Sequence, residues 1–183
     1  MEAFENLKEV QASSRELFQG KILHLYEDTV TLPNGKTAIR EVVRHIGAVC
    51  VIPVTADGKA VVERQFRYAI GMEITEIPAG KLNSRQEDPL EAAKRELQEE
   101  TGITARTFVD LGVFYPAAAY SDEKIRMYLA LDLSWGKREL DEDEFLNVEL
   151  VSLKNLVADA MAGRIPDAKT QLAVLKAAKY LGI

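Results

Sequence analysis

This sequence is poor in the residues that build disulfides and in those that form thiolate or imidazole metal sites. Its 183 residues include one cysteine and two histidines. A single cysteine excludes a disulfide framework within the chain, and Cys50, inside the apolar run 48–52, is predicted to be a buried structural thiol. His24 and His45 have no partner at metal-ligand spacing, so core or surface positions are expected for both.

Long apolar runs and an excess of basic residues are also missing. No stretch approaches the length that crosses a membrane. The net charge of −6 and the pI near 5.1 argue against sequence-independent binding to nucleic acid, which needs a basic surface. An anionic substrate would therefore be held by local arginines and metal ions. The first ten residues are acidic and amphipathic rather than basic and then apolar, so a cytoplasmic protein is expected.

What the sequence does have is enough hydrophobic residues, 47%, for one sizeable core with a small appended subdomain. Helices are predicted at 88–102, 152–162 and 167–180. Strands are predicted at 16–18, 22–30, 36–44, 48–54, 59–65, 73–77, 107–115, 124–133 and 145–151. Strands mixed with two or three helices indicate a mixed sheet with helices packed on its faces.

The helix at 88–102 has clear signals at both ends. Asp88 is suited to cap its N-terminus, and Pro89 fits the first helical position. Glu91 stands where the acid of a capping box belongs, and Gly102 can end the helix as a left-handed cap. Leu97 lies on an apolar stripe that is expected to be buried.

Three carboxylates of this helix are predicted to form one wall of a metal site. Glu96, Glu99 and Glu100 lie three and four residues apart, so they share one helical face. Like charges at this spacing destabilise a helix unless a cation neutralises them, and hard divalent cations prefer carboxylate oxygens. The sequence therefore predicts a Mg²⁺ or Mn²⁺ site, with a solvated acidic helix as the alternative.

The stretch from Gly80 to Ile103, GKLNSRQEDPLEAAKRELQEETGI, resembles the Nudix box. Seven residues separate Glu87 from Arg95, as in that family, and a chance match at six fixed positions has a probability on the order of 10⁻⁵. Six residues separate Gly80 from Glu87, so the loop before the helix is one residue longer than in the family pattern.

The resemblance extends to bacterial ADP-ribose pyrophosphatases of this family and covers roughly residues 15–180. It is carried by the segments 62–68, 76–80, 138–145 and 167–170. The implied fold is α/β, a Nudix α/β/α sandwich with a mixed sheet and a small N-terminal β extension. The expected domains are an extension at 1–45 and a catalytic domain at 46–183. The resemblance also implies a homodimer in which the extension crosses onto the partner.

The resemblance also assigns roles to the box residues. It implies that Glu96, Glu99 and Glu100 hold Mg²⁺ or Mn²⁺, together with the backbone carbonyl of Ala79. Arg95 is expected to pair with a box glutamate such as Glu99 and to fix its rotamer, without touching substrate. An ordinary surface salt bridge is the alternative for Arg95.

A second acidic cluster lies at 141–144 and by composition alone would be a polar loop. Similar enzymes place a catalytic glutamate on a loop here, which implies Glu142 as general base and Glu144 as an extra metal ligand. Glu144 is the next candidate for the base, and a box glutamate such as Glu99 is the third. A carboxylate suits the role because metal-bound water is acidic enough for a weak base to assist.

Arg64 and Arg67 flank a predicted strand end near the box, where an arginine can grip a phosphate through two N–H groups. Similar enzymes contact substrate at the positions of Arg67 and Glu76. A structural ion pair between these two residues is the alternative interpretation.

The loop 114–120 is expected to approach the terminal sugar or nucleoside. Pro116 and Tyr120 are its candidate substrate contacts, and Tyr120 could stack on a base or simply pack. Similar ADP-ribose hydrolases carry a proline where this sequence has Ala118, and Pro116 could substitute for it. This departure favours a broad nucleotide-sugar specificity over a strict preference for ADP-ribose.

The expected function is metal-dependent hydrolysis of the pyrophosphate bond of nucleoside diphosphate sugars, with ADP-ribose and GDP-mannose as candidate substrates. The products would be a nucleoside monophosphate and a sugar phosphate. Nudix hydrolysis of dinucleotides, nucleoside triphosphates or capped RNA is one alternative. A non-catalytic nucleotide sensor is another, although the box carboxylates are intact. The expected partners are a small-molecule substrate and a second copy of the chain, with neither nucleic acid nor membrane.

Overall fold

The computed structural model describes residues 6–140 and 145–183 and divides into two compact units. Unit 1 comprises Met1–His45 and Ala117–Lys124, and unit 2 comprises Ile46–Pro116 and Ile125–Ile183. Of the helices within the described residues, none combines the length and the apolar character of a membrane span.

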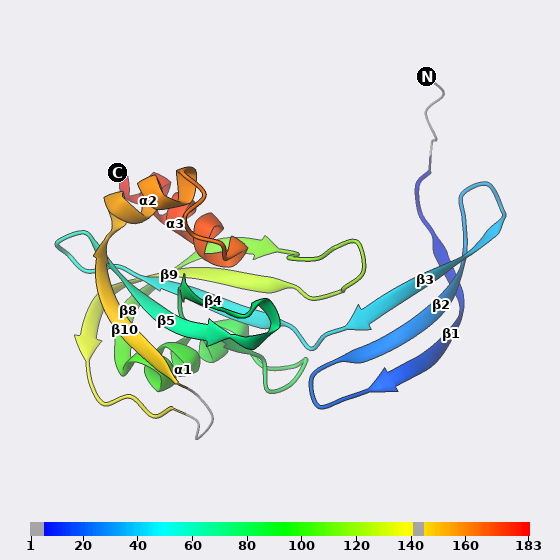
Figure 1. Cartoon of the computed structure of the whole chain (residues 1–183), viewed down its shortest axis with the longest axis horizontal. Coiled ribbons are helices and arrows are strands. Elements are labelled where there is room, and N and C mark those ends of the chain that lie inside the picture. The colour runs from blue at the N-terminus through cyan, green and yellow to red at the C-terminus, as the bar shows by residue number, and fades with distance from the viewer. Residues whose placement is uncertain (1–5, 141–144) are drawn as a thin grey trace. The chain divides into compact units, whose positions relative to one another are not determined.

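The strands of unit 2 form two sheets (Figure 1). Their bounds are Ala48–Pro53 (β4), Lys59–Arg67 (β5), Met72–Glu76 (β6), Ala79–Lys81 (β7), Ile103–Phe114 (β8), Ile125–Trp135 (β9) and Leu146–Ser152 (β10). One sheet has the order β7-β4-β9-β8, in which β4 and β9 are parallel and the other pairs antiparallel. The other sheet, β10-β5-β6, is antiparallel. The predicted mixed sheet is therefore confirmed.

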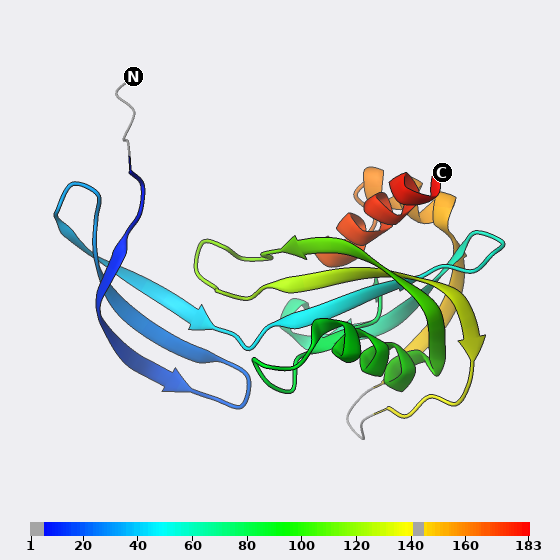
Figure 2. The same ribbon diagram turned by 180° about the vertical axis from the view of Figure 1, so that it is seen from behind.

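The helices of unit 2 are α1 (Pro89–Thr101), α2 (Leu153–Met161) and α3 (Ala168–Leu181), and a short 3₁₀ helix, η1, spans Tyr68–Ile70. Figure 2 shows α1 on one side of the sheets and α2 with α3 on the other. Strand β4 is buried on both faces: Cys50 and Ile52 lie in the core cluster that includes α2 and α3, and Val51 lies in the cluster around α1. Burying one such aliphatic side chain contributes roughly 1.5–3 kcal/mol. The predicted α/β/α sandwich is confirmed.

Asp88, Pro89 and Gly102 act at the ends of α1 as the sequence predicts, whereas the Glu91 carboxylate pairs with Lys94 at 2.7 Å instead of forming the predicted capping box. The Asp88 carboxylate accepts a hydrogen bond from the Leu90 amide at 2.7 Å, and Pro89 is the first helical residue. Gly102 has φ of +73° and donates its amide to the Gln98 carbonyl at 2.8 Å. These caps satisfy backbone groups that the helix itself leaves unpaired, so the boundaries of α1 are fixed locally.

Unit 1 contains an antiparallel sheet of β1 (Val10–Gln19), β2 (His24–Thr31) and β3 (Thr37–Arg44), in that order. The segment Ala117–Lys124, which connects β8 to β9, joins this unit. Val43 of β3 donates its amide to the Tyr120 carbonyl at 2.8 Å and accepts from the Asp122 amide at 3.2 Å. The predicted extension, 1–45, does not include this segment, because its partner strand lies more than 70 residues away in sequence.

Strands β1 and β7 differ most from the sequence prediction, for identifiable reasons. All ten residues of β1 are exposed, so β1 lacks the apolar alternation that marks a half-buried strand, and only 16–18 was predicted. Strand β7 has three residues and forms because it pairs with β4. The residues of β7 alone contain no pattern that predicts this pairing.

The buried state of Cys50 gives a chemical prediction. Burial raises the pKa of the Cys50 thiol to about 12, so the reactive thiolate is almost absent at pH 8. We expect the folded protein to resist a disulfide reagent such as DTNB and to release one equivalent of thionitrobenzoate in denaturant. Stoichiometric reaction of the folded protein within minutes would contradict the buried assignment.

Candidate functional site

Arg95 lies among the carboxylates of α1. Its Nη1 donates to Glu96 Oε1 at 2.7 Å and to Glu99 Oε2 at 3.1 Å. On its other edge, Nη2 lies 3.4 Å from Glu87 Oε1 and 3.2 Å from the Lys81 carbonyl. Partial burial lowers the pKa of Arg95, but the hydrogen bonds to Glu96, Glu99 and Glu87 outweigh that effect and raise the pKa above its ordinary value. The guanidinium therefore stays charged and holds two box glutamates together.

The Glu96 carboxylate rests against the backbone of Gly80 in β7. A Cβ built on Gly80 would lie 2.0 Å from Glu96 Cδ and 2.2 Å from each carboxylate oxygen. The φ of Gly80 is not positive, so the backbone conformation itself would accept any residue. Glycine at this position leaves room for the carboxylate to approach the backbone this closely.

Glu100, one turn further along α1, also reaches the strand that holds Gly80. It is 7% exposed, and its Oε2 accepts a hydrogen bond from the Ala79 amide at 3.0 Å. Ala79 is in turn paired with Cys50 of β4. The helix and the strand are thus joined through two carboxylates, and the backbone of Ala79 is held beside Glu100.

The chemistry of these donors fits a hard divalent cation, because carboxylate and carbonyl oxygens are the ligands that Mg²⁺ and Mn²⁺ prefer. The close contact between the Glu96 carboxylate and the backbone of Gly80 is a second feature that favours a cation site. As the side chains stand, no group of three His, Cys, Asp or Glu residues within 6–140 and 145–183 is arranged to hold an ion. Instead, Glu96 and Glu99 face the guanidinium of Arg95, and Glu100 faces an amide.

The C-terminus of α1 contacts the segment that leads out of β9. The Gly136 amide donates to the Gly102 carbonyl at 2.8 Å, and the Glu139 amide donates to the Glu99 carbonyl at 2.9 Å. The predicted base Glu142 and the predicted extra ligand Glu144 follow shortly after in the chain and lie outside the described residues.

A buried ionic cluster lies at β5, β6 and the start of α3. Glu76, whose side chain is 2% exposed, accepts from Arg67 Nε at 2.5 Å and from Arg67 Nη2 at 2.9 Å. Its Oε2 also accepts from the ammonium of Lys169, which lies 3.1 Å from Asp167 Oδ2. Arg67 and Glu76, both predicted to contact substrate, thus form the ion pair that was the alternative for them. Because the Arg67 side chain is 45% exposed, solvent screens its half of the pair, whereas the Glu76 carboxylate itself is buried.

Lys169 is a residue that the sequence analysis did not single out. Burial lowers the pKa of Lys169, but Asp167 and Glu76 outweigh burial and raise the pKa above its ordinary value. A signal was present in the sequence: Lys169 is the second residue of α3, where the helix dipole disfavours a positive charge. A lysine at this position indicates a specific anionic partner.

The structure does not bring Arg64 together with Arg67. Side chains alternate along a strand, so residues three apart on β5 point to opposite faces of the sheet. Arg64 is half exposed and pairs with Glu73 at 2.8 Å. Pro116 is exposed at the boundary of unit 2, whereas Tyr120 belongs to unit 1 and is 60% exposed.

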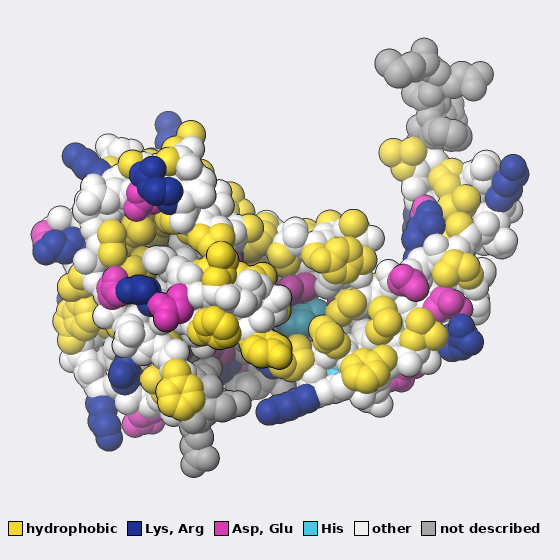
Figure 3. All heavy atoms as spheres, in the orientation of Figure 1, with side chains coloured by type: hydrophobic (Ala, Val, Ile, Leu, Met, Phe, Trp, Pro, Cys, Tyr) yellow, Lys and Arg dark blue, Asp and Glu magenta, His cyan; other side chains and the backbone are white. Residues whose placement is uncertain are grey.

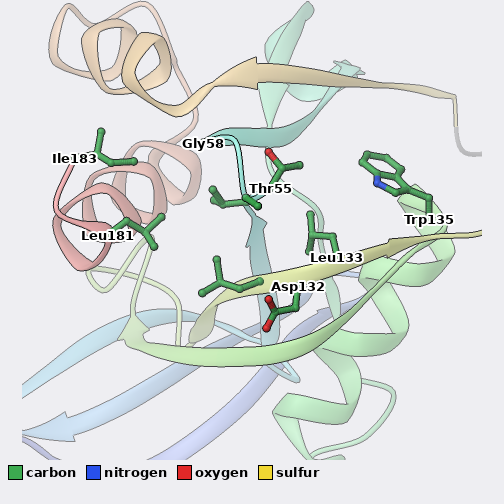
Figure 4. A pocket seen from close by; sticks show the side chains of 10 residues that line it. Thr55, Gly58, Asp132, Leu133, Trp135, Leu181 and Ile183 are labelled. Carbon is green, nitrogen blue, oxygen red and sulfur yellow. The ribbon is translucent and has the colours of Figure 1, made fainter.

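A hollow of about 530 Å³ lies elsewhere in unit 2, between the β4–β5 turn, the end of β9 and the end of α3 (Figure 4). It is lined mainly by apolar side chains, including Leu133, Trp135 and Leu181, with Thr55 and Asp132 as polar members. None of the predicted site residues within the described ranges lines it, and it adjoins the Pro53 end of β4 rather than the Ala48 end that pairs with β7. The hollow is therefore separate from the box carboxylates.

Two family models match this chain in succession. Residues 44–172 match the model described as NUDIX domain. Residues 11–43 match the model described as nucleoside diphosphate sugar hydrolase N-terminal domain.

Similar proteins with curated names include an ADP-ribose pyrophosphatase of Bacillus subtilis (strain 168), 43% identical over 92% of each chain. A methanol dehydrogenase activator of Bacillus methanolicus is 41% identical over 91% of each chain. An ADP-ribose pyrophosphatase of Mycobacterium tuberculosis is 36% identical, covering 90% of this chain and 73% of the other. A solved structure described as an ADP compounds hydrolase aligns with a TM-score of 0.85 at 21% identity over 97% of each chain, which shows the fold.

The seat of Glu96 on Gly80 can be tested by Gly80→Ala. The added methyl group would displace a flexible side-chain end, so we expect the variant to fold while Mn²⁺ affinity falls about 10- to 100-fold in isothermal titration. Gly163→Ala is the control, because a Cβ there meets nothing within 4 Å although φ is +71°. Equal Mn²⁺ affinity in Gly80→Ala and the wild type would contradict a metal role for this seat.

Proposed function

This chain belongs to the Nudix family and is a pyrophosphohydrolase of the ADP-ribose pyrophosphatase type, and from that premise we propose that it is a metal-dependent hydrolase of nucleoside diphosphate sugars. ADP-ribose and GDP-mannose are the proposed substrates, and the products are a nucleoside monophosphate and a sugar phosphate. The observation that carries the proposal is the cluster of Glu96, Glu99 and Glu100 on α1, gathered by Arg95 against the backbone of β7.

The metal proposal rests on residues that the fold brings to one place. The Nudix family generally uses divalent metals, and Glu96, Glu99, Glu100 and the Ala79 carbonyl would hold the ion here. When bound, such an ion polarises phosphoryl oxygens and lowers the pKa of bound water. Arg95 keeps the carboxylates oriented without contacting substrate, as its hydrogen bonds to Glu96 and Glu99 suggest.

Substrate binding and proton transfer are assigned to other residues. Arg67 is proposed to bind a substrate phosphate, since Glu76 engages only Nε and Nη2 and the side chain is 45% exposed. Glu142 is proposed as general base and Glu144 as an extra ligand, from the family resemblance alone. Tyr120 is proposed as a contact for the sugar or base.

The proposed specificity is supported by the N-terminal part of the chain. Residues 11–43 match a domain named for nucleoside diphosphate sugar hydrolases, and two of the relatives are named ADP-ribose pyrophosphatases. These features favour nucleotide sugars over nucleoside triphosphates, dinucleotides or capped RNA. A cytoplasmic location, in keeping with a free thiol at Cys50, completes the proposal.

A homodimer formed through unit 1 is part of the same proposal. Strand β1 is an edge strand exposed along its whole length. Phe18, Ile22, Leu23 and Ile39 of this unit are each more than half exposed, and hydrophobic side chains gather on the visible face of its sheet (Figure 3). A three-stranded sheet with an uncovered apolar surface gains stability when a partner covers it.

The proposed activity is tested by incubating the protein with Mg²⁺ and a panel of nucleotides, with products identified by liquid chromatography and mass spectrometry. The panel contains ADP-ribose, GDP-mannose, dinucleoside polyphosphates, nucleoside triphosphates and capped RNA. We expect nucleoside monophosphate and sugar phosphate from the nucleotide sugars. Turnover confined to the other compounds would replace the proposed substrate class, and no turnover of any compound would remove the enzymatic assignment.

The box carboxylates are tested by Glu100→Gln. The amide oxygen can still accept from Ala79, so the fold is expected to persist, whereas loss of the negative charge should lower kcat/KM by at least about 100-fold. Glu91→Gln is the matched control on the same helix, because within the described residues Glu91 forms its ion pair with Lys94 rather than with a residue of the box. Equal kcat/KM values for the two variants would remove Glu100 from the mechanism.

The proposed dimer is tested by light scattering coupled to size-exclusion chromatography. We expect a dimer for the wild type and a monomer for Phe18→Asp combined with Leu23→Asp, because two buried charges would disfavour the contact. Tyr180→Asp, an exposed aromatic on α3, controls for a general loss of surface hydrophobicity. A monomeric wild type at micromolar concentration would argue against the dimer.

A further inference from the structure

We propose that Lys169 is a positioning residue, which orients the substrate-binding guanidinium of Arg67 by holding the Glu76 carboxylate between the two cations. The inference rests on the proposed function, in which Arg67 binds a substrate phosphate. It adds a residue from the C-terminal helix α3 to the machinery of a site that otherwise comes from β5, β6, β7 and α1.

The Glu76 carboxylate is the shared element. Its side chain is 2% exposed, so water does not set its orientation. Oε1 accepts from Arg67 Nε, and Oε2 accepts both from Arg67 Nη2 and from the Lys169 ammonium. Two parallel bonds from one guanidinium edge fix the plane of Arg67 relative to the carboxylate. Whatever fixes Glu76 therefore fixes the exposed remainder of Arg67.

Lys169 is itself held firmly enough to serve this purpose. Its side chain is 12% exposed, and its ammonium lies 3.1 Å from Asp167 Oδ2. Asp167 is the N-cap of α3 and accepts from the Thr170 amide at 2.9 Å, so the carboxylate is anchored to the helix. The cluster contains two cations and two anions. Without Lys169, a buried carboxylate would keep Arg67 as its only cationic partner among the four residues.

A neighbouring contact separates this role from a general structural one. The Thr170 hydroxyl, which is fully buried, accepts from the Ile77 amide at 3.0 Å, so α3 also holds the backbone that follows Glu76. That bond does not involve Lys169 itself, although the Thr170 hydroxyl donates to Asp167 Oδ2, the oxygen that lies 3.1 Å from the Lys169 ammonium. Loss of the Lys169 charge should therefore free the Glu76 side chain while leaving the path of the chain to Ala79, and with it the metal cage, in place.

The experiment is a double-mutant cycle on steady-state kinetics with ADP-ribose. We expect Lys169→Met to raise KM about 10- to 100-fold, with a smaller change in kcat and an unchanged Mg²⁺ concentration for half-maximal activity. Arg67→Met should raise KM by itself. If Lys169 acts through Arg67, adding Lys169→Met to Arg67→Met should change KM little further, because the two effects share one interaction.

Lys176→Met is the matched control. Lys176 lies on the same helix and its ammonium donates to the Leu111 carbonyl, away from Glu76, so wild-type KM is expected. Glu76→Gln supplies a second route should Lys169→Met fail to fold, and it should show the same KM increase and the same lack of additivity with Arg67→Met. The folded fraction of each variant is measured by circular dichroism.

The outcomes separate the inference from the proposed function. A wild-type KM in Lys169→Met, or an effect that adds fully to that of Arg67→Met, would overturn the positioning role and leave the proposed function intact. A raised Mg²⁺ requirement in Lys169→Met would place the residue with the metal cage and would equally overturn it. A wild-type KM in Arg67→Met would remove Arg67 from substrate binding, and the inference would fall with it.

Discussion

The close approach of α1 to β7 is the contact on which the site depends. Three acids within five residues would repel one another on an isolated helix. Here the Glu96 carboxylate lies against Gly80, which has no side chain to block it, and Glu100 accepts a hydrogen bond from the backbone amide of Ala79. Arg95 supplies a fixed positive charge between Glu96 and Glu99. The cost of clustering negative charge is thereby offset before any ion or substrate is present.

Local features of the sequence were enough to predict α1 and its carboxylates. Capping residues, a first-turn proline and acids at helical spacing all act within a few residues of one another, so they can be recognised in the sequence itself. Strand β1 was under-predicted because all its residues are exposed. The pairing of Lys169 with Glu76 spans 93 residues, and Arg64 and Arg67 were grouped although they point to opposite faces of β5. Such relations arise from tertiary structure, so they cannot be recognised from a short stretch of the sequence.

The proposed metal-site residues and the proposed substrate-binding arginine differ in how the fold supports them. Glu96, Glu99, Glu100 and Arg95 come from one helix, so one stable element fixes them all. Arg67 is fixed by a chain of charges that ends on a different helix, α3. The proposed metal ligands and the proposed substrate-binding arginine are therefore held by different elements of the core.

The segment Ala117–Lys124 has a consequence for how this protein can be divided. Because it pairs with β3, the polypeptide passes between the two units three times, at residues 45, 116 and 124. Residues 1–45 therefore cannot be removed without effect on the rest of the chain. Deleting them would leave the β8–β9 connection without the backbone hydrogen bonds that it forms with β3. Recombination that exchanges N-terminal extensions among homologous genes must therefore also exchange this connection, or preserve its backbone pairing.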